Sequence, residues 1–141
     1  MAFHPKNPVV ATVSDDETWK LWSILDCEVI MSGEGHTSWI AAVEFHPPGT
    51  HMATASGDTT VKVWDFATAT CSATLSDHAH PVWDTSFHHA GDFLVSASMD
   101  HTAKCWGFTY WKMSTDIPWS CRLGECSGLP ALQQSSLYSI W

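Results

Sequence analysis

Residues 35–65 read GHTSWIAAVEFHPPGTHMATASGDTTVKVWD, and the same pattern of residue types returns at residues 77–107 as DHAHPVWDTSFHHAGDFLVSASMDHTAKCWG. The register is a gapless period of 42 residues (64 minus 22 and 106 minus 64 for the recurring tryptophan). A fixed period of this size is typical of stacked structural repeats. The triplets in register are Phe3, Phe45 and Phe87; His4, His46 and His88; Ser14, Ser56 and Ser98; Asp16, Asp58 and Asp100; Thr18, Thr60 and Thr102; Lys20, Lys62 and Lys104; Trp22, Trp64 and Trp106.

Each complete period contains four short segments that favour β-strands. In the middle period they are WIAAVEF, HMATAS, TVKVW and CSATL, which alternate apolar and polar residues or are rich in β-branched ones. Turn-forming residues separate them, with Pro47, Pro48 and Gly49 after the first segment and Gly57 and Asp58 after the second. Four strands per repeat is the number in one blade of a β-propeller.

The segments GHTSW, FHPPG and MATASGDTTVKVWD resemble the WD-repeat pattern, because Gly35-His36, Asp58 and Trp64-Asp65 fall in one register. The resemblance covers residues 1–106, although Trp22 and Trp106 lack the following Asp. It implies an all-β fold, a partial WD-repeat β-propeller of about two complete four-stranded blades plus a partial one, with an irregular C-terminal tail.

The repeat register also predicts the organisation of the chain. We expect a partial blade at residues 1–26, whole blades at 27–68 and 69–110, and a non-repeat tail at 111–141 that is poorly ordered or loosely packed. Because propellers close with about four to eight blades, we expect these blades to belong to a longer chain. The aromatic residues of the tail offer one way to cover the open end.

The composition of the chain argues against several classes of partner and location. The 15 acidic and 6 basic residues give a formal net charge of -9, and Arg122 is the sole arginine, which argues against nucleic-acid and anionic-membrane partners. No apolar run approaches the ~20 residues of a membrane span, and the start MAFHPKNPVV lacks signal-peptide order. We therefore expect a cytoplasmic protein with reduced cysteines. The cysteines are Cys27, Cys71, Cys105, Cys121 and Cys126.

Serine, histidine and aspartate recur together, as they would in a hydrolase triad. Repetition argues against catalysis, because a catalytic group needs one copy with unique surroundings. The resemblance implies instead a buried network in each blade, in which the turn Asp orients the His and a strand Ser or Thr links the His to the Trp indole. The expected network residues are His36, Ser56, Asp58 and Trp64 in one blade and His78, Ser98, Asp100 and Trp106 in the next.

The histidines also raise the alternative of a metal site, especially His78-Ala79-His80 and His88-His89. No cysteine or carboxylate completes a ligand spacing around them, and Cys121 and Cys126 have no second pair. We therefore expect no catalytic residue, no metal and no cofactor.

The protein-binding surface is predicted from residues that leave the repeat register. Trp39 follows the Gly-His turn, where aromatic residues anchor partners, but packing between blades is an equal alternative for Trp39, Trp83 and Trp19. The residue before each turn Asp differs between repeats, as expected for a surface position. The candidate binding surface therefore consists of Asp15, Trp39 and Met99.

A closer resemblance concerns one group of WD-repeat proteins. The segments GEGHTSW, SGDTTVKVWDF and SFHHAGDFLVSASMDHTAKCW are similar to sperm-associated WD-repeat proteins of the ciliary central apparatus. This likeness implies a non-enzymatic scaffold in the axoneme of motile cilia and sperm flagella. Its expected partners are axonemal proteins of the central apparatus and other copies of itself. A general WD-repeat adaptor in ubiquitin ligation or signalling is the alternative, and a histidine-based hydrolase or metalloenzyme is the third.

Overall fold

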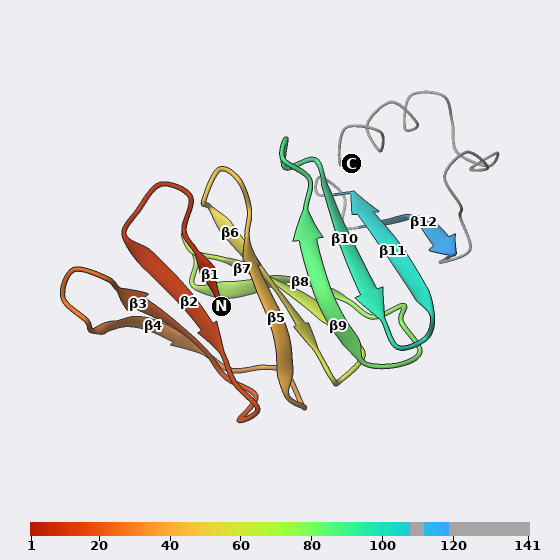
Figure 1. The fold of residues 1–141 in the computed structure, drawn as a ribbon, viewed down its shortest axis with the longest axis horizontal. Helices are drawn as coiled ribbons and strands as arrows, with labels where there is room; N and C mark the ends of the chain where they lie inside the picture. Colours follow the sequence, from red (N-terminus) through yellow and green to blue (C-terminus); the bar gives the residue numbers. More distant parts are fainter. Residues whose placement is uncertain (108–111, 119–141) are drawn as a thin grey trace.

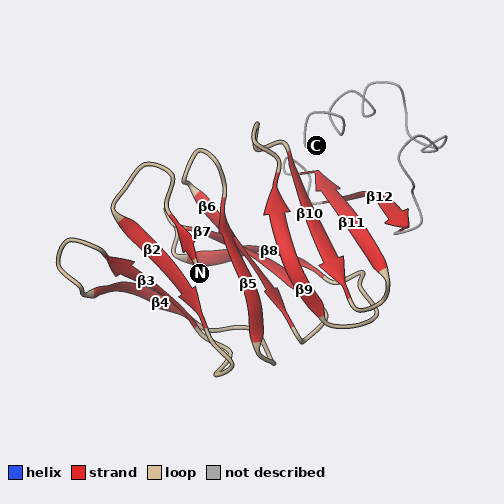
Figure 2. Ribbon diagram, in the orientation of Figure 1, coloured by secondary structure: helices blue, strands red, loops and turns tan. Residues whose placement is uncertain are grey.

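The computed structural model describes residues 1–107 and 112–118, and within these residues the protein is all β. Twelve strands form three antiparallel sheets of four strands each, which lie side by side in chain order (Figure 1). Strands and connecting loops make up all of the coloured ribbon in Figure 2. No helix long and apolar enough to span a membrane occurs in this part of the chain.

Each sheet is a meander in which neighbouring strands follow one another in the sequence. The first contains β1 (Ala2–Phe3), β2 (Val9–Val13), β3 (Trp19–Ser23) and β4 (Val29–Gly33). The second contains β5 (Ile40–Phe45), β6 (His51–Ser56), β7 (Val61–Asp65) and β8 (Thr70–Leu75). The third contains β9 (Val82–Phe87), β10 (Phe93–Ser98), β11 (Thr102–Gly107) and β12 (Lys112–Pro118).

The sheets are displaced by one strand from the sequence repeats. The repeat at residues 27–68 supplies β4 to the first sheet and β5, β6 and β7 to the second, and the repeat at 69–110 supplies β8 to the second sheet and β9, β10 and β11 to the third. Each repeat therefore joins two sheets. The backbone hydrogen bonds of β4 and β8 tie successive sheets together in addition to side-chain packing.

The two ends of the chain differ from the central repeat. β1 has two residues and pairs only with Val10 and Ala11, so the first strand of the first sheet is shorter than β5 and β9, its equivalents in the other two sheets. Residues 112–118, which the repeat pattern leaves in the irregular tail, pair as β12 with β11 and complete the third sheet. Pairing uses backbone groups that every residue carries, so the repeat pattern is not needed to form this strand. Residues 108–111 and 119–141 lie outside the described residues.

The core lies between the sheets. Ala11, Trp19 and Leu21 of the first sheet pack against apolar residues of the second, among them Phe45, Met52 and Trp64. A second cluster joins Ala53, Ala55, Val61 and Val63 of the second sheet to Val82, Phe87, Leu94 and Trp106 of the third. Since a fully buried large apolar side chain contributes about 1.5–3 kcal/mol, these two interfaces are the main source of stability in the described part.

A histidine contact repeats at both interfaces between sheets. The imidazole Nε2 of His4 donates to the carbonyl of Gly49 at 3.0 Å, and that of His46 donates to the carbonyl of Gly91 at 3.0 Å. Both glycines have a φ of 82°, and a Cβ on either would lie within 2.6 Å of the imidazole. Only glycine meets both requirements at this position.

Candidate interaction face and the histidine networks

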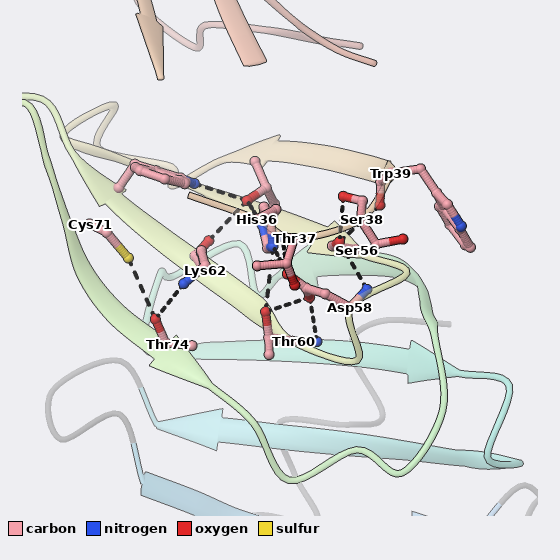
Figure 3. Close-up of polar contacts among 12 residues, drawn as sticks. His36, Thr37, Ser38, Trp39, Ser56, Asp58, Thr60, Lys62, Cys71 and Thr74 are labelled. Carbon is pink, nitrogen blue, oxygen red and sulfur yellow. Dashed lines mark hydrogen bonds and ion pairs between the residues drawn. The ribbon is translucent and has the colours of Figure 1, made fainter. Parts of the chain in front are cut away.

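A chain of hydrogen bonds runs through the second sheet from Trp64 to Asp58. The Trp64 indole Nε1 donates to the Thr54 hydroxyl at 2.9 Å, and this hydroxyl lies 2.8 Å from His36 Nε2. The other imidazole nitrogen, Nδ1, lies 2.7 Å from Asp58 Oδ2 (Figure 3). One assignment of protons satisfies every group: His36 Nδ1 donates to the carboxylate, and Nε2 accepts from Thr54.

The third sheet repeats this arrangement one period later. Trp106 Nε1 donates to the Ser96 hydroxyl at 2.8 Å, Ser96 lies 2.7 Å from His78 Nε2, and His78 Nδ1 lies 2.7 Å from Asp100 Oδ2. His36 and His78 are each 4% exposed, and both tryptophans are also buried. Buried polar groups without partners would each cost about 1–3 kcal/mol, so the closed chain is what allows these residues to lie in the core.

Burial and hydrogen bonding set the ionisation of these networks. Burial lowers the pKa of His36, and Asp58 only partly opposes this effect, so the imidazole is neutral at pH 7. Burial alone would raise the pKa of Asp58, but hydrogen bonds from Thr60, His36 and the Thr37 backbone outweigh it and lower the pKa to about 2. The equivalent hydrogen bonds outweigh burial at Asp100 and place its pKa well below the usual range.

The sequence predicts Ser56 and Ser98 as the hydroxyl residues of the networks, but the hydroxyl that links His36 to Trp64 belongs to Thr54, and its equivalent in the third sheet is Ser96. The Ser56 hydroxyl instead donates to the carbonyls of Ser38 and Trp39, and it accepts from the Asp58 backbone N–H at 3.1 Å. Ser98 makes the equivalent bonds to His80, Pro81 and Asp100. A signal for Thr54 exists in the sequence, since a hydroxyl residue stands ten positions before each recurring tryptophan. The pairs are Thr12 and Trp22, Thr54 and Trp64, and Ser96 and Trp106.

This geometry differs from a serine hydrolase triad. Ser56 makes its hydrogen bonds to backbone groups, and the hydroxyl beside His36 is that of Thr54, whose side chain is fully buried. A nucleophile must reach a substrate carbonyl, and a fully buried hydroxyl has no room for one. No group of three residues suited to a metal ion occurs among the described residues.

The turns and entry segments of the three sheets gather at one end of the molecule. This interaction face contains the turns β2–β3, β6–β7 and β10–β11 and the segments that lead into β5 and β9. Gly57 N–H donates to the Trp39 carbonyl at 2.8 Å, and Met99 N–H donates to the Pro81 carbonyl at 2.9 Å. These matching bonds hold each entry segment against the turn of its own sheet.

Trp39 and Trp83 form a pair that joins the second and third sheets on this face. Their ring centroids are 4.7 Å apart with an interplanar angle of 39°. The Trp39 ring also covers Gly57, where a Cβ would lie only 2.4 Å from the ring, so Gly57 leaves room for the indole. Trp83 is 55% exposed, which leaves an aromatic surface open to a partner.

The remaining predicted surface residues lie in the turns. Asp15 is exposed in the β2–β3 turn, and Met99 is 57% exposed in the β10–β11 turn. The sequence left two alternatives for Trp19, packing between blades or binding a partner. Trp19 is 4% exposed, and its ring centroid lies 5.1 Å from that of Trp64 inside the first interface, so it packs between blades. The predicted binding surface did not include Trp83. Trp83 lies outside the recurring tryptophan position, as Trp39 does, so the sequence offered the same reason to include it.

The repeats of this chain are similar to those of known proteins. The family described as WD domain, G-beta repeat (WD40) matches residues 1–23, 27–65 and 69–107. A stretch of 36 residues, 26% of this chain, is 50% identical to the flagellar WD repeat-containing protein Pf20 of Chlamydomonas reinhardtii and spans only 6% of that protein. WD40 repeats indicate a scaffold for protein interactions. Since the three repeat matches cover well over half of the residues, this chain belongs to the WD40 repeat family.

Proposed function

We propose that this protein is a non-enzymatic scaffold of the axoneme in motile cilia and sperm flagella, where it contacts other proteins of the central apparatus through the interaction face. The Trp39–Trp83 pair, in which Trp83 is 55% exposed, is the observation that supports this face most strongly. Tryptophan is enriched where interfaces concentrate their binding energy. The second sheet holds one ring over Gly57, so the pair is positioned before a partner arrives.

The flagellar assignment is supported by the likeness to Pf20, whose name describes a flagellar WD-repeat protein. The net charge of -9 favours partners with basic surfaces and disfavours direct contact with other acidic chains. The protein therefore acts by holding partner proteins in place, and its histidine networks serve to stabilise the blades that present the face.

Proximity labelling in ciliated cells tests this function. The wild-type chain fused to a labelling enzyme is expected to mark axonemal central-apparatus proteins, and Trp83→Ala is expected to lose a specific subset of them. Leu25→Ala is the matched control, because Leu25 is a large apolar residue, 77% exposed, in the β3–β4 connection at the opposite end of the sheets.

The labelled proteins also distinguish the alternatives. A wild-type neighbourhood without axonemal proteins would contradict the ciliary assignment, and one rich in ubiquitin-ligase or signalling subunits would favour the general adaptor. If Trp83→Ala labels the same axonemal proteins as the wild type, the ciliary location would stand, but the proposed role of the interaction face in binding would be contradicted.

A further inference from the structure

The Trp39–Trp83 pair joins the second and third sheets only and does not follow the repeat, unlike the histidine networks. Trp83 is the bulged residue of β9, because the pairing with β10 shifts by one residue at this point. The same bulge occurs in β5, where the extra residue is Ala41. A β-bulge re-aims a side chain, and in β9 the re-aimed side chain is a large aromatic one.

Two carboxylates lie near the pair, on the neighbouring edge strands β5 and β9. Asp84, next to Trp83, accepts through Oδ1 from the Thr85 backbone N–H at 2.9 Å. Glu44 of β5 reaches across to β9 and accepts from the Phe87 backbone N–H at 2.8 Å. Burial raises the pKa of Glu44, and the Asp84 carboxylate acts in the same direction, so the two charges lie close enough to repel each other.

The negative charges around the pair are not balanced by lysine within residues 1–107. Asp84 and Glu44 form no ion pair in this part of the chain, and Asp84 Oδ2 accepts no hydrogen bond there. Asp58, which directly follows Gly57 beneath the Trp39 ring, is paired with a neutral imidazole, so its network keeps a full negative charge. An exposed aromatic ring surrounded by unbalanced negative charge attracts a cation.

Among the side chains that a partner protein could place here, the guanidinium of arginine fits best. An apolar side chain would bury Asp84 without a new partner, which costs free energy, and a carboxylate would be repelled. The lysine ammonium is a compact point charge. A guanidinium is planar, so it can stack on the ring of Trp83 and present several N–H donors to the open oxygen of Asp84.

We propose that the interaction face binds an arginine side chain of a partner protein, with the guanidinium stacked on Trp83 and donating to Asp84. Glu44 and Asp58 add negative charge without direct contact. The binding of arginine rests on the proposed function of this face and names the partner chemistry that the face recognises. The overall net charge favours basic surfaces but selects neither a residue type nor a position.

A short peptide with one central arginine among glycines and serines is the probe, titrated into the whole chain. The indole N–H resonances report binding at each tryptophan, and Trp83→Phe identifies the resonance of Trp83. The arginine peptide is expected to shift the resonances of Trp83 and Trp39 and to leave that of Trp19, which is buried, unchanged. The absence of any shift of the Trp83 resonance at millimolar peptide would overturn the proposal.

Two altered peptides separate charge from shape. Citrulline is planar like arginine but neutral, and its peptide is expected to bind about fivefold more weakly. The lysine peptide keeps the charge but loses the planar stack and the fork of donors, so it is also expected to bind more weakly than arginine. Equal binding of the arginine and citrulline peptides, or tighter binding of the lysine peptide, would overturn the proposal.

A pair of matched variants locates the charge that the peptide contacts. Asp84→Asn keeps an oxygen for the Thr85 N–H but removes the charge, and it is expected to weaken the arginine peptide about threefold while leaving the citrulline peptide unchanged. Asp92→Asn is the control, because Asp92 is exposed in the β9–β10 turn, at the opposite end of the strands, and the variant changes the net charge equally. Equal weakening by the two variants would mean that net charge alone acts, and it would overturn the site.

The peptide titration and the proximity labelling can fail independently. Arginine binding at Trp83, in a chain whose cellular neighbourhood lacks axonemal proteins, would contradict the proposed location and leave the arginine site standing. Loss of axonemal labelling in Trp83→Ala, without any preference of the face for arginine over citrulline, would leave the proposed function standing and overturn the arginine site.

Discussion

At the scale of single residues, the Thr54 hydroxyl makes hydrogen bonds to two buried side chains at once. It accepts from Trp64 Nε1 and contacts His36 Nε2 while its residue is fully buried. Replacing it with a methyl group leaves two buried polar atoms without their partner, and each such loss costs about 1–3 kcal/mol.

Thr54→Val is therefore expected to lower the free energy of unfolding by about 2–4 kcal/mol, measured by urea denaturation. Thr54→Ser keeps the hydroxyl, is the residue found at Ser96, and is expected to cost only about 1 kcal/mol for the lost methyl group. Equal losses for the two variants would show that the methyl group, and not the hydrogen bonds, is what matters.

The ionisation of His36 predicts a pH dependence. Burial lowers the pKa of His36 below its ordinary value of 6.5, so the unfolded chain binds this proton more readily than the folded one. Stability from the neutral imidazole is thus fully present above pH 6.5 and is lost as the pH falls through the unfolded value toward the folded one. Asp58, with a pKa of about 2 against 3.8, adds a further loss between about pH 4 and 2.

The urea midpoint is accordingly expected to fall from pH 8 to pH 5.5, and an NMR titration of the imidazole resonances should place the His36 pKa below 6.5. Free histidine in the same buffer serves as the reference for the titration. A His36 pKa above 6.5 would mean that Asp58 outweighs burial.

At the scale of elements, the tight turns show a shared backbone strain. Glu17, Thr59 and His101 stand at the same repeat position, directly after the turn Asp, and have φ values of 71°, 72° and 66°. This left-handed region costs a residue with a Cβ roughly 1–2 kcal/mol. In the second sheet the Asp58 side chain holds the turn by accepting from the Thr60 backbone N–H and hydroxyl, so the position with positive φ does not need glycine.

Thr59→Gly removes this strain, offset in part by the larger backbone entropy of glycine in the unfolded chain. We expect a net gain in the free energy of unfolding of about 0.5–1 kcal/mol, seen as a higher Tm. Thr60→Gly, one residue later, is expected to be destabilising because it removes the hydroxyl that donates to Asp58. A loss of stability in Thr59→Gly would show that the Thr59 side chain makes a contribution larger than the strain.

At the scale of the whole molecule, the sheets depend on one another. The positions of Ala53, Ala55, Val61 and Val63 are fully buried in the second sheet because the third sheet covers them. Their equivalents in the third sheet, Val95, Ala97, Ala103 and Cys105, are only half-buried. The middle sheet, packed on both sides, is therefore the most stable part of the described chain.

The contact between His46 and Gly91 tests this dependence. Gly91→Ala places a Cβ 2.5 Å from His46 Nε2 and also a side chain at a φ of 82°. The expected loss in the free energy of unfolding is about 2–4 kcal/mol, measured by urea denaturation with Asp92→Ala, an exposed neighbour, as the control. A loss under about 1 kcal/mol would show that the third sheet shifts freely against the second.

The sequence by itself determined the period, the four strands of each repeat and the residues that recur in register. These features are local or repeated, so the chemistry of each strand and turn is visible in the order of the residues. It also indicated that Trp39 and Trp83 leave the pattern, without deciding whether they pack or remain exposed.

Only the tertiary structure decided which residues meet. It joined Thr54 to His36 across 18 positions and His46 to Gly91 across 45. It also buried Trp19 against Trp64 and brought Trp39 and Trp83 into a tilted contact with the Trp83 ring exposed. It also placed β12 at the edge of the third sheet. The physical reason is that such partners are selected by packing between sheets, and a periodic sequence offers several residues of the same type for each contact.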